Sequence, residues 1–515
     1  MLKYYIIFGY LALIMMVGLL FSKQKDTKNF FVAGKSMHWF PVAISYVASL
    51  VSAISFMALP LWTWEHGMLP AFNEIFVVLF ALPIIVFIFL PLYGRIGLIS
   101  IYEFLEHRFS LLIRIAGSFL FLLSRFLWLG MVIYIPSKTL GYITGMQTWH
   151  LILIIGFLAT IYTCVGGMKA VIWTDVVQFV ILFSGVLLVL ATVCGRFEGG
   201  LSEVVQQGIA LDKIKFFRWS WSWETPNTWI LLFGAIYSFQ NFASDQVVMQ
   251  RFLSTKSIKS SIVSFVAACG INLVLVFLMY LVGAFLFVYY VKFPDQIQGI
   301  ELDYIYPRFI VNELPELFGA LLIAAILAAS MSSVDSGLNS ITAVLINDYF
   351  IRFSPKKHSE GRLLQLSRWL TVVIGLIVTA VGFLIPRIGT NFIDIVLYTA
   401  GWFAPPLAAI FLLGAVSRRT NWHGALVTLV VVPIVMISLW HLKVLPSWIF
   451  GVLSMTGSLF IGYFTSLFFK APDEEKLKYV WQPAYRKLAL VKRNAIDDGR
   501  VFGDHNLGDE TSEEI

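Results

Sequence analysis

Charged residues are scarce in this 515-residue chain: Asp, Glu, Lys and Arg together make up 13% of it. Soluble domains carry about 25% charged residues, so the shortage excludes a soluble enzyme and a disordered chain. Cysteine is scarce as well. Cys164, Cys194 and Cys269 lie far apart in sequence and have no histidine at metal-ligand spacing. This pattern excludes a disulfide scaffold and disfavours a metal centre at the cysteines.

The motifs of common catalytic and nucleotide-binding sites are also missing. The chain has no HExxH, no GxxxxGK(S/T) and no Ser-His-Asp order in a supporting context. Without a P-loop, the chain does not itself carry an ATP-driven pump. We therefore expect no enzyme activity and no cofactor. The distribution of the net charge of +7 indicates membrane topology rather than nucleic-acid binding.

Apolar residues, in contrast, are abundant: they make up 59% of the chain, with 45 Phe and 16 Trp. They form continuous runs of the roughly 20 residues that a membrane-spanning helix needs, whereas the strands of an outer-membrane barrel alternate apolar and polar residues. The sequence therefore predicts an all-α polytopic membrane protein with about thirteen transmembrane helices. The predicted spans are about 2–22, 39–62, 74–94, 115–143, 149–164, 171–194, 228–249, 261–290, 317–347, 364–385, 391–416, 422–440 and 447–469.

The positive residues predict how these spans are oriented in the plasma membrane. If the N-terminus lies outside, 26 of the 37 Lys and Arg residues fall in cytoplasmic segments and nine in outer segments, while Arg125 and Lys138 lie within a span. Cytoplasmic loops carry the excess of Lys and Arg. We therefore expect the N-terminus outside and the C-terminus inside, with residues 471–515 as a cytoplasmic tail.

Two predicted spans are interrupted by polar residues. The span at 39–62 contains Ser45, Ser49, Ser52, Ser55 and Pro60. The span at 228–249 contains Gly234, Ser238, Gln240, Asn241, Ser244, Asp245 and Gln246. Broken helices at corresponding positions of two halves are typical of inverted-repeat transporters with a binding site near the bilayer midplane. We expect one repeat over about 39–194 and the other over about 228–416.

The span at 317–347 combines small residues with an acid. Ala329, Ser332, Ser333 and Ser336 share one helix face. Hydroxyl oxygens on such a face suit a dehydrated Na⁺, although small residues also allow close helix packing. Asp335, in mid-membrane, costs about 2.5–3.5 kcal/mol unless a partner, cation or proton offsets its charge.

Two further charged residues lie within predicted spans. Asp175 begins a span at its cytoplasmic end, where the helix dipole alone also favours an acid. Arg125 lies in the heart of its span and is suited to a two-pronged grip on a substrate carboxylate. The alternatives for Arg125 are a snorkelling side chain or a structural pair with an acid such as Glu74 or Asp394.

These features resemble the sodium/solute symporter family, whose members include sodium-coupled sugar, sialic acid, proline, iodide and vitamin transporters. The similarity covers roughly 30–470 and is most specific at 162–178, YTCVGGMKAVIWTDVVQ. Shorter similar segments are FFVAGKS at 30–36, YEFLEHRF at 102–109, Asp245-Gln246 with Gln250-Arg251, AASMSSVDS at 328–336, Pro405-Pro406 and Gly424-Ala425.

The resemblance implies a LeuT-type fold and Na⁺-driven alternating access. Five plus five inverted core helices would be preceded by the helix at 2–22 and followed by two extra helices at 422–469, in one transmembrane domain at 1–470. We expect a monomer in the lipid bilayer that imports a small organic solute with Na⁺.

The resemblance also implies ion-site residues. The common sodium site would consist of Ala48, Val51, Ala329, Ser332 and Ser333. A second cation would bind at Asp175, Ser332, Asp335 and Ser336. Other members have Ser at the position of Asp335, which leaves the second ion open. A proton-coupled carrier, with Asp175 and Asp335 titrating, is an alternative on the same fold.

The substrate cavity is implied in the same way. Arg125 stands where related sialic acid transporters have a carboxylate-binding arginine, which points to an anion such as a sialic acid or a monocarboxylate. Leu50 and Leu397 stand where sugar transporters use polar residues, although a sugar or other neutral solute is the alternative. The remaining cavity residues would be Ser49, Ser52, Ser55, Phe56, Asn241, Phe242, Thr399 and Trp402, with Phe239 as a further apolar wall. A sensor or an intramembrane enzyme is the competing class.

Overall fold

The computed structural model describes residues 27–481 except 97, 99, 220–226, 237, 355–357 and 389–391, and nine earlier positions at 5, 9, 10, 12–14, 16, 17 and 20. Most of the predicted span at 2–22 and of the predicted tail at 471–515 lies outside the described residues. Within the described part, β-pairing is limited to an isolated bridge between Met37 and Thr255.

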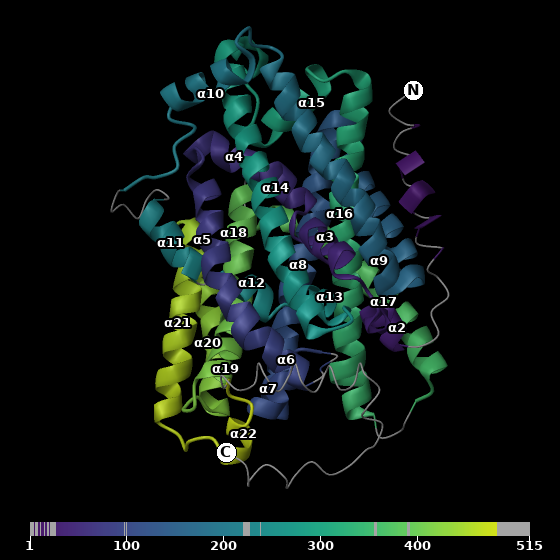
Figure 1. Ribbon diagram of the computed structural model, residues 1–515, viewed down its shortest axis with the longest axis vertical. Coiled ribbons are helices and arrows are strands. Elements are labelled where there is room, and N and C mark those ends of the chain that lie inside the picture. The colour runs from purple at the N-terminus through teal and green to yellow at the C-terminus, as the bar shows by residue number, and fades with distance from the viewer. Residues whose placement is uncertain are drawn as a thin grey trace.

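The described chain is almost entirely helical (Figure 1). In chain order the elements are α2 (Thr27–Val32), η1 (Ala33–Lys35), α3 (Trp39–Leu50), α4 (Ala53–His66), α5 (Leu69–Ile84), η2 (Ile85–Phe89), α6 (Leu90–Ile96), α7 (Glu103–Arg108), α8 (Leu111–Thr144), α9 (Thr148–Cys194), α10 (Gly200–Ala210), α11 (Thr228–Ile236), α12 (Gln240–Ala243), α13 (Gln246–Leu253), α14 (Ile258–Lys292), η3 (Pro294–Gln296), η4 (Leu302–Tyr304), α15 (Ile305–Asn312), α16 (Glu316–Val344), η5 (Leu345–Ile351), α17 (Glu360–Gly382), η6 (Ile385–Arg387), α18 (Phe392–Trp402), α19 (Ala404–Val416), α20 (Trp422–His441), η7 (Ser447–Ile449), α21 (Phe450–Leu467) and α22 (Glu474–Leu477).

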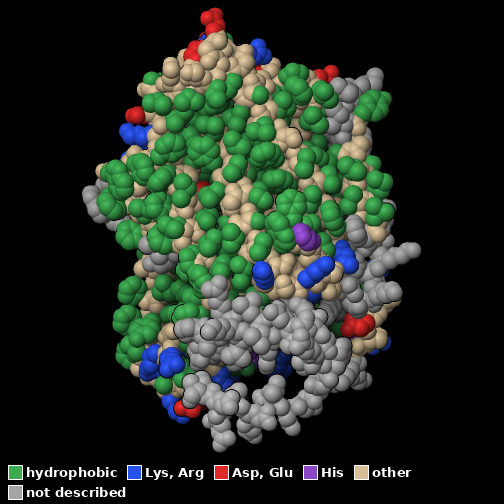
Figure 2. Space-filling view, in the orientation of Figure 1, with side chains coloured by type: hydrophobic (Ala, Val, Ile, Leu, Met, Phe, Trp, Pro, Cys, Tyr) green, Lys and Arg blue, Asp and Glu red, His purple; other side chains and the backbone are tan. Residues whose placement is uncertain are grey.

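Nine helical stretches among the described residues are long and apolar enough to cross a membrane, and the bent pair α3–α4 makes a tenth. The helices run mainly along the long axis of Figure 1, with α10 and α15 at one end and α7 and α22 at the other. Figure 2 shows hydrophobic side chains over most of the middle of one face and charged side chains mainly towards its two ends. This distribution is that of a polytopic membrane protein.

The interruption expected at 39–62 lies between α3 and α4, which are bent by 60° relative to each other. Val51 leaves the helical conformation with φ −83° and ψ 82°. Ser52 then caps α4, because its Oγ accepts a hydrogen bond of 3.2 Å from the Ile54 N–H. The second interruption separates α11, α12 and α13. Both breaks expose backbone carbonyls and amides that a continuous helix would use internally.

The spans predicted separately at 149–164 and 171–194 are two helical segments of α9 that a break at Gly167 divides. Gly167 has φ 59° and ψ −173°, which only glycine adopts readily. A β-carbon there would lie 3.1 Å from the Phe30 carbonyl oxygen. The break therefore depends on both the backbone freedom and the small size of this glycine.

The helix α16 lies at the centre of the protein, and most of its residues are buried from Ala320 to Val344. Its small alanines and serines allow neighbouring helices to approach closely. The serine face predicted at 329–336 is therefore enclosed by protein rather than exposed to lipid.

Candidate functional site

Four of the five residues predicted for the sodium site lie around one narrow space. Ala48 and Val51, at the break after α3, face Ala329 and Ser332 of α16, and Gln178 of α9 also lines the space. The Ser332 Oγ lies 3.4 Å from the Ala48 carbonyl oxygen. The end of the broken helix and the serine face of α16 therefore meet.

Ser333, the fifth residue of the predicted sodium site, is buried on α16. Its Oγ has no hydrogen-bond partner among the described residues. A buried polar group without a partner lowers the stability of the fold by about 1–3 kcal/mol. A cation that binds oxygen ligands would give the Ser333 hydroxyl a partner. Carbonyl and hydroxyl oxygens are the ligands that hard cations prefer, and the group of donors at this break fits Na⁺.

The residues predicted for a second cation also lie close together. The Asp175 carboxylate accepts hydrogen bonds from the hydroxyls of Ser45, at 2.5 Å, and Ser332. The Ser336 Oγ lies 2.7 Å from the Ser332 carbonyl oxygen and 3.0 Å from Asp335 Oδ1. Asp175, Ser332, Asp335 and Ser336 thus form one connected polar group.

The sequence analysis missed the main partner of Asp175. Arg251 is fully buried, and its Nη2 lies 3.1 Å from Asp175 Oδ2. Arg251 also donates hydrogen bonds to the Ser45 Oγ at 3.0 Å and to the Ser336 Oγ. The charge of Asp175 is therefore offset by a guanidinium of the protein itself. The only signal in the sequence was the Gln250-Arg251 pair directly after the second interruption.

Arg125 forms an ion pair with Asp245, which lies at the break between α12 and α13. Glu74, one of the two partners suggested from the sequence, is not the residue found there, and the side chain of Asp394 lies outside the described residues. Asp245 Oδ1 also accepts a hydrogen bond of 2.9 Å from the Val247 N–H and so caps α13. The side chains of Arg125 and Asp245 are 19% and 12% exposed.

The other residues predicted for the cavity make contacts of their own. On α18, Thr399 Oγ1 lies 3.3 Å from the Met131 Sδ of α8, and the buried Trp402 Nε1 has no hydrogen-bond partner among the described residues. Ser49 and Ser52 use their hydroxyls within the α3–α4 segment.

The aromatic residues of the predicted cavity pack against other rings. Phe242 packs against Phe265 at 5.4 Å between ring centroids, and Phe56 lies 5.5 Å from Tyr306 of α15. Phe239 is buried and Ser55 is partly exposed. The side chain of Asn241 lies outside the described residues.

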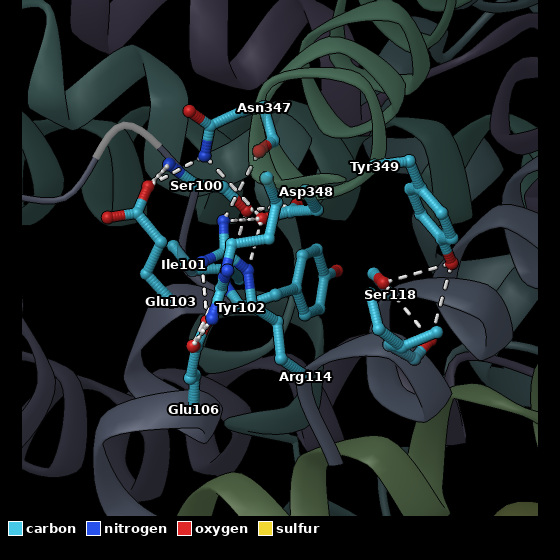
Figure 3. Close-up of polar contacts among 12 residues, drawn as sticks. Ser100, Ile101, Tyr102, Glu103, Glu106, Arg114, Ser118, Asn347, Asp348 and Tyr349 are labelled. Carbon is cyan, nitrogen blue, oxygen red and sulfur yellow. Dashed lines mark hydrogen bonds and ion pairs between the residues drawn. The ribbon is translucent and has the colours of Figure 1, made fainter. Parts of the chain in front are cut away.

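A second polar cluster, which the sequence analysis did not find, joins α7, α8 and the end of the α16–η5 helix (Figure 3). Asp348 accepts hydrogen bonds from the Ser100 Oγ at 2.5 Å and from Arg114. Glu106 pairs with Arg114 at 2.8 Å and with Arg352 at 2.7 Å. The hydrogen bonds from Arg352 and Arg114 lower the pKa of Glu106 to about 2. This α7 polar cluster fixes the short helix α7 against two long helices.

Comparison with known proteins places this geometry in a family. The profile of the Sodium:solute symporter family matches residues 30–431. The Sodium/sialic acid symporter NanT of Aliivibrio fischeri (strain ATCC 700601 / ES114) is 32% identical over 484 residues, which cover 91% of this chain and 94% of that protein. The human Sodium-coupled monocarboxylate transporter 1 is 28% identical over 447 residues, or 82% of this chain and 71% of that protein.

A solved structure of a Na⁺-coupled sialic acid symporter, in a substrate-bound outward-open state, has a TM-score of 0.83 and 28% sequence identity. The match covers 92% of this chain and 99% of that chain. The family and these relatives are sodium-coupled solute transporters and not enzymes. The chain therefore belongs to the sodium:solute symporter family and is a multi-pass membrane protein that couples solute transport to Na⁺.

Proposed function

We propose that the protein imports a small carboxylate-bearing solute together with Na⁺, and that this solute is a sialic acid. The observation that carries the proposal is the position of Arg125. This residue lies half-way along α8 and forms an ion pair with the carboxylate of Asp245. A guanidinium is suited to carboxylates because it donates two parallel hydrogen bonds. The similarity to a sialic acid symporter over nine-tenths of the chain supports the same substrate class.

A monocarboxylate is the second candidate, because the same arginine would bind its carboxylate and the human monocarboxylate transporter is a relative. A neutral sugar is disfavoured because Leu50 and Leu397 stand where related sugar transporters use polar residues. A proton-coupled carrier is the alternative hypothesis, and the transport experiment below distinguishes it from a Na⁺-coupled carrier.

For the coupling ion, we propose that Na⁺ binds where α3 ends, at the carbonyl oxygens of Ala48 and Val51 and at Ala329, Ser332 and Ser333 of α16. The support for this site is the unpartnered Ser333 hydroxyl and the 3.4 Å approach of Ser332 to the Ala48 carbonyl. Unwound carbonyls of broken helices bind coupling ions in transporters of this kind.

A second cation would bind at the group of Asp175, Ser332, Asp335 and Ser336. Arg251 competes for the same carboxylate and the same Ser336 hydroxyl. We therefore propose that this ion, when it binds, draws Asp175 partly away from Arg251. The alternative is that Asp175 or Asp335 binds a proton, in which case transport would depend on pH in a different way.

For the architecture, we propose one transmembrane domain at 1–470 with thirteen spans. Five core helices over about 39–194 and five over about 228–416 would be related as inverted repeats, with the helix at 2–22 before them and those at 422–469 after them. The N-terminus would lie outside and the C-terminus, with the tail at 471–515, in the cytoplasm. We propose a monomer as the functional unit.

Uptake into proteoliposomes tests the proposed function. We expect accumulation of radiolabelled N-acetylneuraminate under an inward Na⁺ gradient and not under a K⁺ or proton gradient alone. Arg125→Lys keeps the charge but loses the two-pronged geometry, so affinity for the acid should fall by about 1–3 kcal/mol. Full uptake of the acid by well-folded Arg125→Ala, or a preference of the wild type for a neutral sugar, would contradict the proposal.

A further inference from the structure

The ion pair between Arg125 and Asp245 places a carboxylate of the protein where the proposed function needs a carboxylate of the solute. We infer that Asp245 is an internal substitute for that group: it occupies Arg125 in the empty site and releases it when an acidic solute binds. This inference rests on the proposed function, in which Arg125 grips an anionic substrate. It assigns Asp245 a role in substrate specificity.

The two oxygens of Asp245 have different partners. Oδ1 accepts a hydrogen bond of 2.9 Å from the Val247 N–H at the start of α13, while Oδ2 faces Arg125. An acid at the N-terminus of a helix is stabilised by the cap and by the helix dipole. Asp245 therefore keeps a partner after it has released Arg125, which lowers the cost of the exchange.

Its partial exposure to solvent distinguishes this pair from the ion pair of Arg251 and Asp175. Arg251 and Asp175 are both 0% exposed, whereas Arg125 and Asp245 are 19% and 12% exposed. A fully enclosed pair cannot lose one partner without leaving a buried charge uncompensated. A partly exposed pair can instead exchange a protein carboxylate for a solute carboxylate, and Arg125 remains paired throughout.

The exchange makes the site selective for anions. An acidic solute can replace Asp245, because it offers Arg125 the same two-oxygen group. A neutral solute offers no such replacement and leaves the pair intact. The competition also lowers the affinity for the acid, because only the fraction of molecules with a released Arg125 can bind it.

The backbone around Asp245 does not depend on the ion pair. The Tyr93 hydroxyl donates a hydrogen bond of 2.7 Å to the Ala243 carbonyl, and the Tyr102 hydroxyl donates one of 3.0 Å to the Ser244 carbonyl. Asparagine and serine are both good helix caps. Asp245→Asn and Asp245→Ser therefore remove the competing charge while the break and the cap of α13 are retained.

The test compares Na⁺-driven uptake of N-acetylneuraminate with that of its methyl ester, which lacks the charge, in wild-type and Asp245→Asn proteoliposomes. We expect the KM for the acid to fall by about three- to tenfold in Asp245→Asn, as for a competent state populated about a tenth to a third of the time. The KM for the ester should stay within about twofold. Asp245→Ser should behave in the same way, and Asp303→Asn, which removes the acid paired with Lys138 farther along α8, should change neither KM.

The outcomes separate the inference from the proposed function. If the wild type takes up the acid in preference to the ester and Arg125→Ala loses this preference, but neither Asp245 variant lowers the KM for the acid, the exchange is wrong and the proposed function stands. An equal change of KM for acid and ester would also overturn the exchange, because it would mark Asp245 as a general gating residue. If the wild type takes up neither the acid nor a monocarboxylate, both fail together.

Discussion

Replacing Arg251 with methionine would remove the positive charge that faces Asp175 in the centre of the protein. Both side chains are fully buried, and the Arg251 Nη2 lies 3.1 Å from Asp175 Oδ2. Without Arg251, the hydrogen bonds that described residues still donate to the carboxylate come from the hydroxyls of Ser45 and Ser332. Removing one partner of a buried ion pair costs about 3–5 kcal/mol, because the remaining charge is left uncompensated.

The same reasoning applies to Asp175→Asn, which leaves the guanidinium of Arg251 without its counter-ion. The double variant Asp175→Asn/Arg251→Met buries no unpaired charge. Its loss of stability should therefore be smaller than the sum of the two single losses by about 1–3 kcal/mol, the scale of coupling between residues in contact. Ser336→Ala is the matched control, because it removes one hydroxyl contact of Arg251 and no charge.

The free energy of unfolding is measured by denaturant titration of the purified protein in mixed micelles. The reasoning that this pair is a buried, mutually dependent unit would be refuted if the double variant lost as much stability as the two single variants together. Losses below about 1 kcal/mol in the single variants would refute it as well. The Na⁺ dependence of uptake supplies a second readout. A lower Hill coefficient in Asp175→Asn would support a second cation, whereas an altered pH profile with an unchanged coefficient would support a proton.

Two further predictions concern helix packing and the α7 polar cluster. In Gly283→Ala, the new β-carbon would lie 2.1 Å from the Pro60 carbonyl oxygen, so α14 and α4 must separate, at a cost of about 1–3 kcal/mol. The control is Gly270→Ala on the same helix, where no described atom lies within 4 Å of the new β-carbon, and it should be neutral or stabilising. Equal unfolding temperatures for the two variants would contradict the packing. Arg352 is the main cause that lowers the pKa of Glu106 from its ordinary 4.5 to about 2. The stabilisation is therefore fully present above pH about 4.5 and is lost as the pH falls towards 2. Glu106→Gln should lower the unfolding temperature at pH 7, and this difference should vanish as the pH falls below about 2. A difference that is unchanged at low pH would contradict the ion pair.

The sequence predicts the helices well because membrane-spanning helices need long apolar runs, which the helices of soluble proteins rarely contain. The break after α3 was expected from its serines, and it lies at Val51 and Ser52. The exact form of the break in α9 was not predicted, because it depends on the φ of a single glycine, Gly167. Local composition therefore identifies the interrupted helices, while the conformation at each break is set by packing.

The charged partners could not be predicted from local pattern. Asp175 and Arg251 are 76 residues apart in the sequence. Asp245 and Arg125 are 120 residues apart. Periodicity identifies residues that share one helix face, but it does not identify which helices pack together. The α7 polar cluster was missed for the same reason, since Ser100 and Asp348 are 248 residues apart.

The central claim is that Na⁺ drives transport by binding between the end of α3 and the serine face of α16. It is tested most directly by the Na⁺ dependence of uptake in Ser332→Ala/Ser333→Ala, with Ser330→Ala as a control on the same helix, whose hydroxyl donates to the Val132 carbonyl of α8. Each hydrogen-bond-like contact to a charge is worth about 1.5–3 kcal/mol, so the apparent Na⁺ affinity of the double variant should fall about tenfold or more, while that of the control should not change. An unchanged Na⁺ dependence in a well-folded Ser332→Ala/Ser333→Ala protein would contradict the claim.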